Sequence, residues 1–165
     1  MATQPRPTEL LLERGCFDDL DDVMQVMETA FDPAFGEAWT RSQCAGILPM
    51  RGVVLWLARD AKGRALGFAL WRTIIDDSEL LLLAVAPRSQ GQGIGAALLD
   101  LFMSQARREG AARLHLEVRD GNRAVQFYER AGFRLAGRRC DYYRSAGDTR
   151  HDALTYSLYI DPTGS

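Results

Sequence analysis

Residues 80–97, LLLLAVAPRSQGQGIGAA, decide how this chain of 165 residues folds. An apolar run ends in a proline-containing turn, and Gly91, Gly93 and Gly95 follow at alternate positions. Because glycine has no side chain, the backbone there can turn tightly and present successive N–H groups. The pattern of residues 94–109 then predicts an amphipathic helix with Leu101 and its neighbours on the apolar face. Unpaired N–H donors and the positive end of the helix dipole attract anions, so the stretch predicts a phosphate-binding turn.

Length and charge narrow the classes of function. A chain of this length fits one domain, residues 1–165, in which we expect residues 1–8 to form a flexible N-terminus. The formal net charge of −2 lacks the basic excess typical of nucleic-acid-binding proteins. No apolar run approaches the roughly 18 residues of a membrane span, and the N-terminus lacks the apolar core of a signal peptide. We expect a cytoplasmic protein without a nucleic-acid or membrane partner.

The cysteines do not predict a metal site. Cys16, Cys44 and Cys140 are odd in number, far apart and not in metal-ligand spacing. Reduced, packed thiols are the interpretation that this pattern favours, because disulfides and zinc sites need paired or regularly spaced cysteines. We therefore expect no bound metal.

Turn signals and periodicity along the chain predict a strand, two helices, three strands, a helix, a strand, a helix and two strands. The expected strands cover residues 10–14, 53–59, 65–75, 79–85, 113–119, 133–143 and 152–160. The expected helices cover residues 18–30, a short segment capped by Thr40, residues 94–109 and residues 124–131. A tight turn at residues 60–63 joins the second and third strands as an antiparallel hairpin.

Two common phosphate-binding motifs compete for the glycine turn. A P-loop is excluded because no Gly-Lys-Ser/Thr follows, and Lys62 is the only lysine in the chain. The dinucleotide pattern G-x-G-x-x-A fits Gly91, Gly93 and Ala96, and Glu117 lies at the distance of a ribose-binding carboxylate. However, the spacer of residues 86–90 and the preceding hairpin disfavour the dinucleotide fold, which turns directly after its first strand.

Two motifs in the same order resemble those of the GNAT superfamily of acetyl-CoA-dependent N-acetyltransferases. Residues 90–95, QGQGIG, match the signature Q/R-x-x-G-x-G/A of its pyrophosphate loop, and residues 124–133, AVQFYERAGF, resemble its A-x-x-x-Y-x-x-x-G-F segment with one spacing difference. Within the superfamily, residues 116–122, LEVRDGN, are similar to the LEVRxxN segment of the bacterial ribosomal-protein-alanine N-acetyltransferase (RimI-like) group. Residues 141–143 and 152–153 resemble the last strands of that group.

The chain departs from the RimI-like pattern in two places. The interval from Glu117 to Tyr128 is one residue shorter than in that group, so Asn122 and Tyr128 do not both align without a gap. The loop of residues 32–39 is longer. These departures bear on the acceptor more than on the type of reaction.

The resemblance implies an α/β (α+β) fold, with a mixed, mostly antiparallel sheet of about seven strands and helices on both faces. The sheet would be splayed at its centre near Val85 and Glu117, so that acetyl-CoA enters one side and an acceptor amine the other. A backbone N–H near Val85 would polarise the thioester carbonyl. The cofactor residues that the resemblance implies are Leu83, Ala84, Val85, Gln90, Gly91, Gln92, Gly93, Ile94, Gly95, Ala96 and Asn122. For Asn122, a role in a surface turn is the alternative.

Glu117 is the candidate general base. Residues 113–119 alternate apolar side chains with His115, Glu117 and Arg119, which places these three on one face of a strand. Acyl transfer to an amine requires the neutral amine, and Glu117 would take the proton through a water molecule. A structural carboxylate paired with Arg119 or Arg123 is the alternative. His115 is compatible with a proton relay, although a structural histidine is the commoner case.

Tyr128 is the general acid that the resemblance implies for the departing thiolate. Its ordinary pKa of about 10 exceeds the value of about 8.5 for a thiol, so the phenol keeps its proton until it is needed. A packed aromatic on a helix is the alternative. The loop of residues 32–39 is a candidate substrate lid, and the candidates for lining the acceptor groove are Phe35, Trp39, Tyr142 and Tyr143.

The acceptor that fits this chemistry best is a protein N-terminal α-amine. At pH 7 an α-amine with pKa near 8 loses its proton for about 1 to 1.4 kcal/mol, whereas a lysine near 10.4 costs about 4.6 kcal/mol. Acetylation of a small-molecule amine or a lysine side chain stays open, as does an acetyl-CoA sensor without turnover, which Glu117 and Tyr128 disfavour. The protein would be a monomer or a homodimer.

Overall fold

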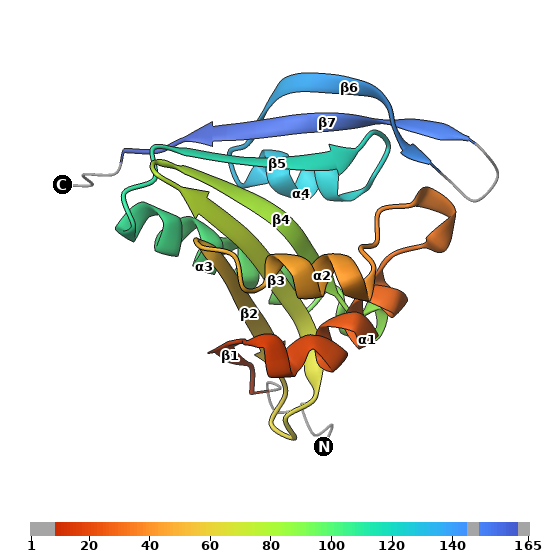
Figure 1. Cartoon of the computed structure of the whole chain (residues 1–165), viewed down its shortest axis with the longest axis vertical. Coiled ribbons are helices and arrows are strands. Elements are labelled where there is room, and N and C mark those ends of the chain that lie inside the picture. Colours follow the sequence, from red (N-terminus) through yellow and green to blue (C-terminus); the bar gives the residue numbers. More distant parts are fainter. Residues whose placement is uncertain (1–8, 145–148, 162–165) are drawn as a thin grey trace, which may run out of the picture.

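The computed structural model describes residues 9–144 and 149–161, so the flexible stretch expected at residues 1–8 lies outside the described residues. Within them, the strands form one sheet in the order β1-β2-β3-β4-β5-β7-β6 (Figure 1). Neighbouring strands are antiparallel except for the parallel pair β4 and β5. The expected mixed, mostly antiparallel sheet is confirmed.

The order of elements is the one that the sequence predicts, with ends displaced by one or two residues. The strands are β1 (Leu11–Arg14), β2 (Val53–Arg59), β3 (Ala65–Ile74), β4 (Asp77–Val85), β5 (Arg113–Arg119), β6 (Arg134–Arg144) and β7 (Arg150–Tyr159). The α-helices are α1 (Leu20–Ala30), α2 (Arg41–Ile47), α3 (Ile94–Arg108) and α4 (Ala124–Arg130). Short 3-10 turns are η1 (Phe17–Asp19), η2 (Pro33–Phe35) and η3 (Pro87–Ser89).

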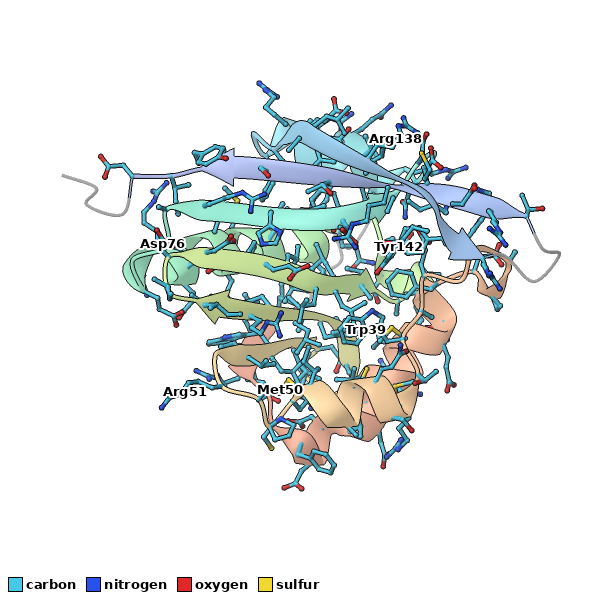
Figure 2. All side chains as sticks on the ribbon, turned by 45° about the horizontal axis from the view of Figure 1, so that its top comes forward. Trp39, Met50, Arg51, Asp76, Arg138 and Tyr142 are labelled. Atoms are coloured by element: carbon cyan, nitrogen blue, oxygen red, sulfur yellow. The ribbon has the colours of Figure 1, made fainter. Side chains whose placement is uncertain are left out.

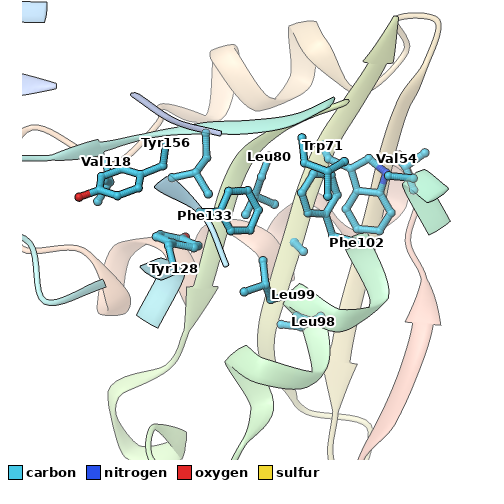
Figure 3. Packing of buried hydrophobic residues seen from close by; sticks show 14 of the residues in the cluster. Val54, Trp71, Leu80, Leu98, Leu99, Phe102, Val118, Tyr128, Phe133 and Tyr156 are labelled. Carbon is cyan, nitrogen blue, oxygen red and sulfur yellow. The ribbon is translucent and has the colours of Figure 1, made fainter. Parts of the chain in front are cut away.

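Helices cover both faces of the sheet, α1 and α2 on one and α3 and α4 on the other (Figure 1). Each pair encloses its own apolar cluster. Figure 3 shows the cluster on the α3 and α4 side, in which Phe102 and Leu99 of α3 lie near Trp71 and Leu80 of the sheet. The fully buried face of α3 includes Leu99, whereas Leu101, which the pattern assigned to that face, is only half-buried.

The sheet opens at its centre. The β4–β5 ladder runs from the pair Asp77 and Arg113 to the pair Leu80 and Leu116, and it stops there. Beyond this point β4 continues to Val85 beside β3 while β5 diverges with β7 (Figure 1). The split expected near Val85 and Glu117 is therefore confirmed.

A β-bulge at Leu81 marks the start of the split. Along β3, Leu70 pairs with Leu82 but the next residue, Trp71, pairs with Leu80, so Leu81 is an extra residue in β4. One extra residue reverses which face each later side chain occupies. Leu80 accordingly packs with the α3 side and Leu82 with the α1 side. The bulge explains a leucine run that strict alternation does not predict.

The three cysteines are free thiols in different surroundings. Cys44, on α2, is buried in the apolar cluster on the α1 and α2 side of the sheet, and burial raises the pKa of its thiol. Cys16 and Cys140 are exposed, so the expected packing holds only for Cys44. In the part of the chain that the structure describes, no cluster of His, Cys, Asp and Glu side chains could hold a metal ion. No helix described there is long and apolar enough to cross a membrane.

Candidate functional site

A cleft of about 680 Å³ occupies the split between β4 and β5. Its walls come from β4, the carboxyl-terminal half of β5, the start of α4, the segment after α1 and the end of β6. Both candidate catalytic residues, Glu117 and Tyr128, line it. The predicted cofactor residues that line it are Leu83, Ala84, Val85, Gln90 and Asn122.

The glycine turn lies beside this cleft, at the start of α3. Gly91 and Gly93 have φ values of 76° and 83°, which L side chains rarely adopt. A Cβ at either position would meet nothing within 4 Å, so backbone conformation and open approach, rather than packing, require glycine here. Ile94 is the first residue of α3 and is buried. The residues predicted to bind an anion through their N–H groups, Gly91, Gln92, Gly93, Ile94, Gly95 and Ala96, thus lie at a helix start, which is where such binding is favoured.

Gln90 connects the turn to the end of β4. Its side-chain Nε2 donates a hydrogen bond of 3.1 Å to the carbonyl oxygen of Val85. Residues 81–85 have no β5 partner in the ladder, so the edge of β4 that is not paired with β3 faces the cleft. A backbone edge without a strand partner can bind an extended amide-containing ligand.

Glu117 lies on the cleft-facing side of β5 with 19% of its side chain exposed. Its carboxylate Oε1 lies 3.2 Å from Nε of Arg139 on β6, whose own side chain is 62% exposed. The alternative that named Arg119 or Arg123 as the partner is therefore wrong, because Arg119 pairs elsewhere and β6 supplies the arginine. A pair with so exposed an arginine contributes little to stability.

Tyr128 projects from α4 and is 7% exposed. Its ring packs against Phe133, with centroids 6.1 Å apart (Figure 3). Burial raises the pKa of Tyr128 well above its ordinary value, and the charge of Glu37 raises it further. The pKa of Tyr143, on β6, is raised by burial and by Glu117 and Glu37. The cleft thus keeps both phenols protonated.

His115 does not contact Glu117. Its Nε2 lies 2.8 Å from Oδ1 of Asp77 at the start of β4, and Arg113 Nη1 donates to the other oxygen of Asp77 at 3.1 Å. This contact with Asp77 agrees with a structural role for His115 and does not support a proton relay to Glu117.

The aromatic residues expected on the acceptor side all line the cleft. Phe35 and Trp39 come from the segment between α1 and α2, and Tyr142 and Tyr143 from the end of β6. Figure 2 shows Trp39 and Tyr142 at the same end of the sheet, although they are far apart in the sequence. The 32–39 loop and the end of β6 therefore face the same cleft.

Glu37 is a cleft residue that sequence reasoning missed. Its Oε1 accepts hydrogen bonds from Asn122 Nδ2 at 2.8 Å and from Arg119 Nε at 3.2 Å. Glu37 and Arg119 are each 11% exposed. A loop has no periodic pattern that would indicate where its side chains point, so the sequence did not single out Glu37. The only related signal was the length of the loop that carries it.

Residues 32–142 match the family model described as an acetyltransferase (GNAT) domain. Among curated relatives, the ribosomal protein bS18-alanine N-acetyltransferase of Escherichia coli (strain K12) is 38% identical over 99 residues, which are 59% of this chain and 66% of the relative. The chain thus spans just under two thirds of that relative's length. The protein of the same name from Haemophilus ducreyi is 29% identical over 145 residues, which are 82% of this chain and 100% of the relative.

A solved structure is similar over nearly the whole chain. The crystal structure of the ribosomal-protein-S18-alanine N-acetyltransferase from Escherichia coli has a TM-score of 0.84 and 28% identity to this chain. The comparison covers 95% of this chain and 97% of the other. The split sheet, the glycine turn and the helices around them therefore follow a known arrangement.

Proposed function

Because the chain belongs to the acetyltransferase (GNAT) domain family, we propose that it transfers the acetyl group of acetyl-CoA to the N-terminal α-amine of a protein. The observation that carries the proposal is the cleft at the sheet split, which holds the carboxylate of Glu117 and the buried phenol of Tyr128 beside a glycine turn at a helix start. Proton acceptor, proton donor and anion cradle are the parts that acyl transfer from a thioester needs.

The residues beside the split fit acetyl-CoA. The N–H groups of residues 91–96 suit the pyrophosphate. The open edge of β4, which includes Leu83, Ala84 and Val85, suits the amide-containing pantetheine arm, with Gln90 and Asn122 at its two sides. When bound, acetyl-CoA supplies the activated acetyl group as a thioester.

The reaction needs two proton transfers, and the cleft offers a group for each. Glu117 accepts a proton from the acceptor amine through a water molecule, and the neutral nitrogen forms a bond to the acetyl carbonyl carbon. A backbone N–H near Val85 stabilises the negative charge that develops on the carbonyl oxygen. As the carbon–sulfur bond breaks, Tyr128 donates its proton to the thiolate and the carbonyl re-forms. The bonded nitrogen loses its remaining extra proton to solvent, and solvent returns a proton to Tyr128. The products are the acetylated amine and coenzyme A.

Two arguments favour an N-terminal α-amine as the acceptor. A single carboxylate base suits an amine whose pKa lies about one unit above neutral pH better than a lysine near 10.4. The relatives in Escherichia coli and Haemophilus ducreyi are named for alanine acetylation on ribosomal protein bS18. A ribosomal-protein acceptor would place the enzyme in the cytoplasm.

An acceptor panel tests the proposal. Release of coenzyme A from acetyl-CoA would be followed with peptides that begin with alanine, the same peptides with acetylated N-termini and one internal lysine, and polyamines. We expect release with the first group only. Release with the blocked lysine peptides or with polyamines alone would replace the proposed acceptor, and release with none would favour the sensor.

A further inference from the structure

The segment between α1 and α2 is held against the far wall of the cleft. Phe35 lies beneath the guanidinium of Arg119, with Cζ 3.8 Å from the ring centroid, and it meets the His151 ring edge-on at 5.6 Å. Gly36 has a φ of 66°, and a Cβ there would lie 2.2 Å from the carbonyl oxygen of Arg144. The backbone of the segment is therefore in close contact with the end of β6.

Glu37 adds the polar part of this attachment. Arg119 neutralises its charge, which lowers the cost of placing a carboxylate where only 11% of it is exposed. The same oxygen also accepts from Asn122 Nδ2. These two contacts, both with groups of the cleft wall, give Glu37 the role of a fixed point.

Asn122 is held at both ends of its amide. Nδ2 donates to Glu37, and Oδ1 accepts from the backbone N–H of Ala124 at 2.8 Å, in the first turn of α4. After these two bonds the amide keeps one N–H and one oxygen lone pair for a ligand. Asn122 is also among the residues that we expect to contact acetyl-CoA. Glu37 thus connects a loop on the acceptor side with a residue predicted on the cofactor side.

We propose that Glu37 is a positioning residue that fixes the 32–39 loop as a wall of the acceptor site and orients the Asn122 amide toward acetyl-CoA. This inference rests on the proposed function. Because one side chain serves both sites, a ligand on either side stabilises the arrangement that the other ligand needs, and the coupling is reciprocal. The 32–39 loop is what brings Glu37 to Arg119 and Asn122.

A double-mutant cycle on acetyl-CoA binding tests the link. The dissociation constant for acetyl-CoA would be measured by calorimetry for the wild type, Glu37→Ala, Asn122→Ala and the double variant, without an acceptor. Loss of one hydrogen bond to a ligand weakens binding by about tenfold, and we expect this for Asn122→Ala and a somewhat smaller loss for Glu37→Ala. If Glu37 acts through Asn122, the double variant binds no more weakly than Asn122→Ala. Losses that multiply would overturn the proposal.

Rescue and acceptor kinetics separate positioning from general instability. Glu37→Gln keeps an amide oxygen that can accept from Arg119 and Asn122, so we expect near-normal acetyl-CoA binding and peptide KM, whereas Glu37→Ala raises that KM about fivefold or more. Glu28→Ala, on the exposed side of α1, is the matched control and should change neither value. If Glu37→Ala does not fold, Glu37→Gln and Gly36→Ala test the positioning role in its place. Gly36→Ala displaces the loop without altering the carboxylate of Glu37.

The outcomes distinguish this inference from the proposed function. A wild-type protein that does not bind acetyl-CoA would overturn both. A wild-type protein that binds and acetylates, together with Gly36→Ala and Glu37→Ala variants of unchanged acetyl-CoA affinity and peptide KM, would overturn the role of Glu37 alone. Weaker acetyl-CoA binding in both of these variants, together with near-normal binding in Glu37→Gln, supports the positioning role of Glu37.

Discussion

The two sides of the cleft are built in different ways. On the glycine-turn side, the proposed binding surface consists of consecutive backbone groups of residues 90–96 and the open edge of β4. On the opposite side, the side chain of Glu37 contacts Arg119 and Asn122. Both partners lie more than eighty residues away from Glu37 in the sequence. A backbone site depends on conformation and tolerates changes of side chain. A side-chain site depends on individual atoms, so single substitutions should have their largest effects there and at the reacting groups between the two sides.

The largest effect is expected for Glu117→Gln, which removes the base but keeps the shape of the side chain. We expect the rate at neutral pH to fall by about 10² to 10⁴, and to fall less at alkaline pH, where more of the acceptor amine is already neutral. Steady-state rates from pH 6 to 10 measure this. An unchanged pH–rate profile would remove Glu117 as the base.

Arg139→Ala is the matched control for Glu117. The arginine lies 3.2 Å from the carboxylate but is largely exposed, so its loss should change the rate less than tenfold. A loss as large as that of Glu117→Gln would instead show that the pair, and not the free carboxylate, is what the reaction needs.

The next effect is expected for Tyr128→Phe, which keeps the ring and removes the proton donor. We expect a loss of about 10²-fold in rate. Tyr159→Phe, on the exposed end of β7, is the control and should have wild-type activity. A fully active Tyr128→Phe variant would leave Tyr128 as a packed aromatic.

The pH dependence of the wild type gives a second test of Tyr128. Burial and the charge of Glu37 raise the pKa of Tyr128 above its ordinary value near 10. The folded protein therefore holds this proton more tightly than the unfolded chain does. The resulting stability is complete below pH 10 and is lost as the pH rises above it. Denaturant unfolding at pH 9 and pH 11 should show a smaller decrease for Tyr128→Phe than for the wild type.

The two sides also differ in how far the sequence predicts them. The glycine turn, the order of helices and strands along the chain and the inward position of Glu117 follow from local patterns, because turns and alternation depend on neighbouring residues. The Leu81 bulge, the Arg139 partner of Glu117 and the bonds of Glu37 do not, because each depends on which distant strand or loop comes to lie nearby. Glu37 stood in a loop without periodicity, so only the three-dimensional arrangement revealed its contacts.

The smallest effect is expected for substitutions in the glycine turn, where two nearby positions differ in backbone conformation. Gly93 has a φ of 83°, so Gly93→Ala is strained by about 1 to 2 kcal/mol although nothing lies within 4 Å of the new Cβ. Gly95 lies inside α3, and a Cβ there would be 3.7 Å from Phe127 and Val85, an ordinary contact. The family signature, which allows glycine or alanine at this second position, agrees with that geometry.

Acetyl-CoA titrations and thermal unfolding of the two alanine variants measure the difference. We expect Gly93→Ala to lose about fivefold to thirtyfold in acetyl-CoA affinity, since a strain of about 1 to 2 kcal/mol in the bound conformation corresponds to that factor. Gly95→Ala should keep its stability and most of its affinity. If Gly95→Ala were the weaker binder of the two, close approach of the ligand to the first turn of α3, and not the left-handed backbone at Gly93, would be the reason that this turn needs glycine.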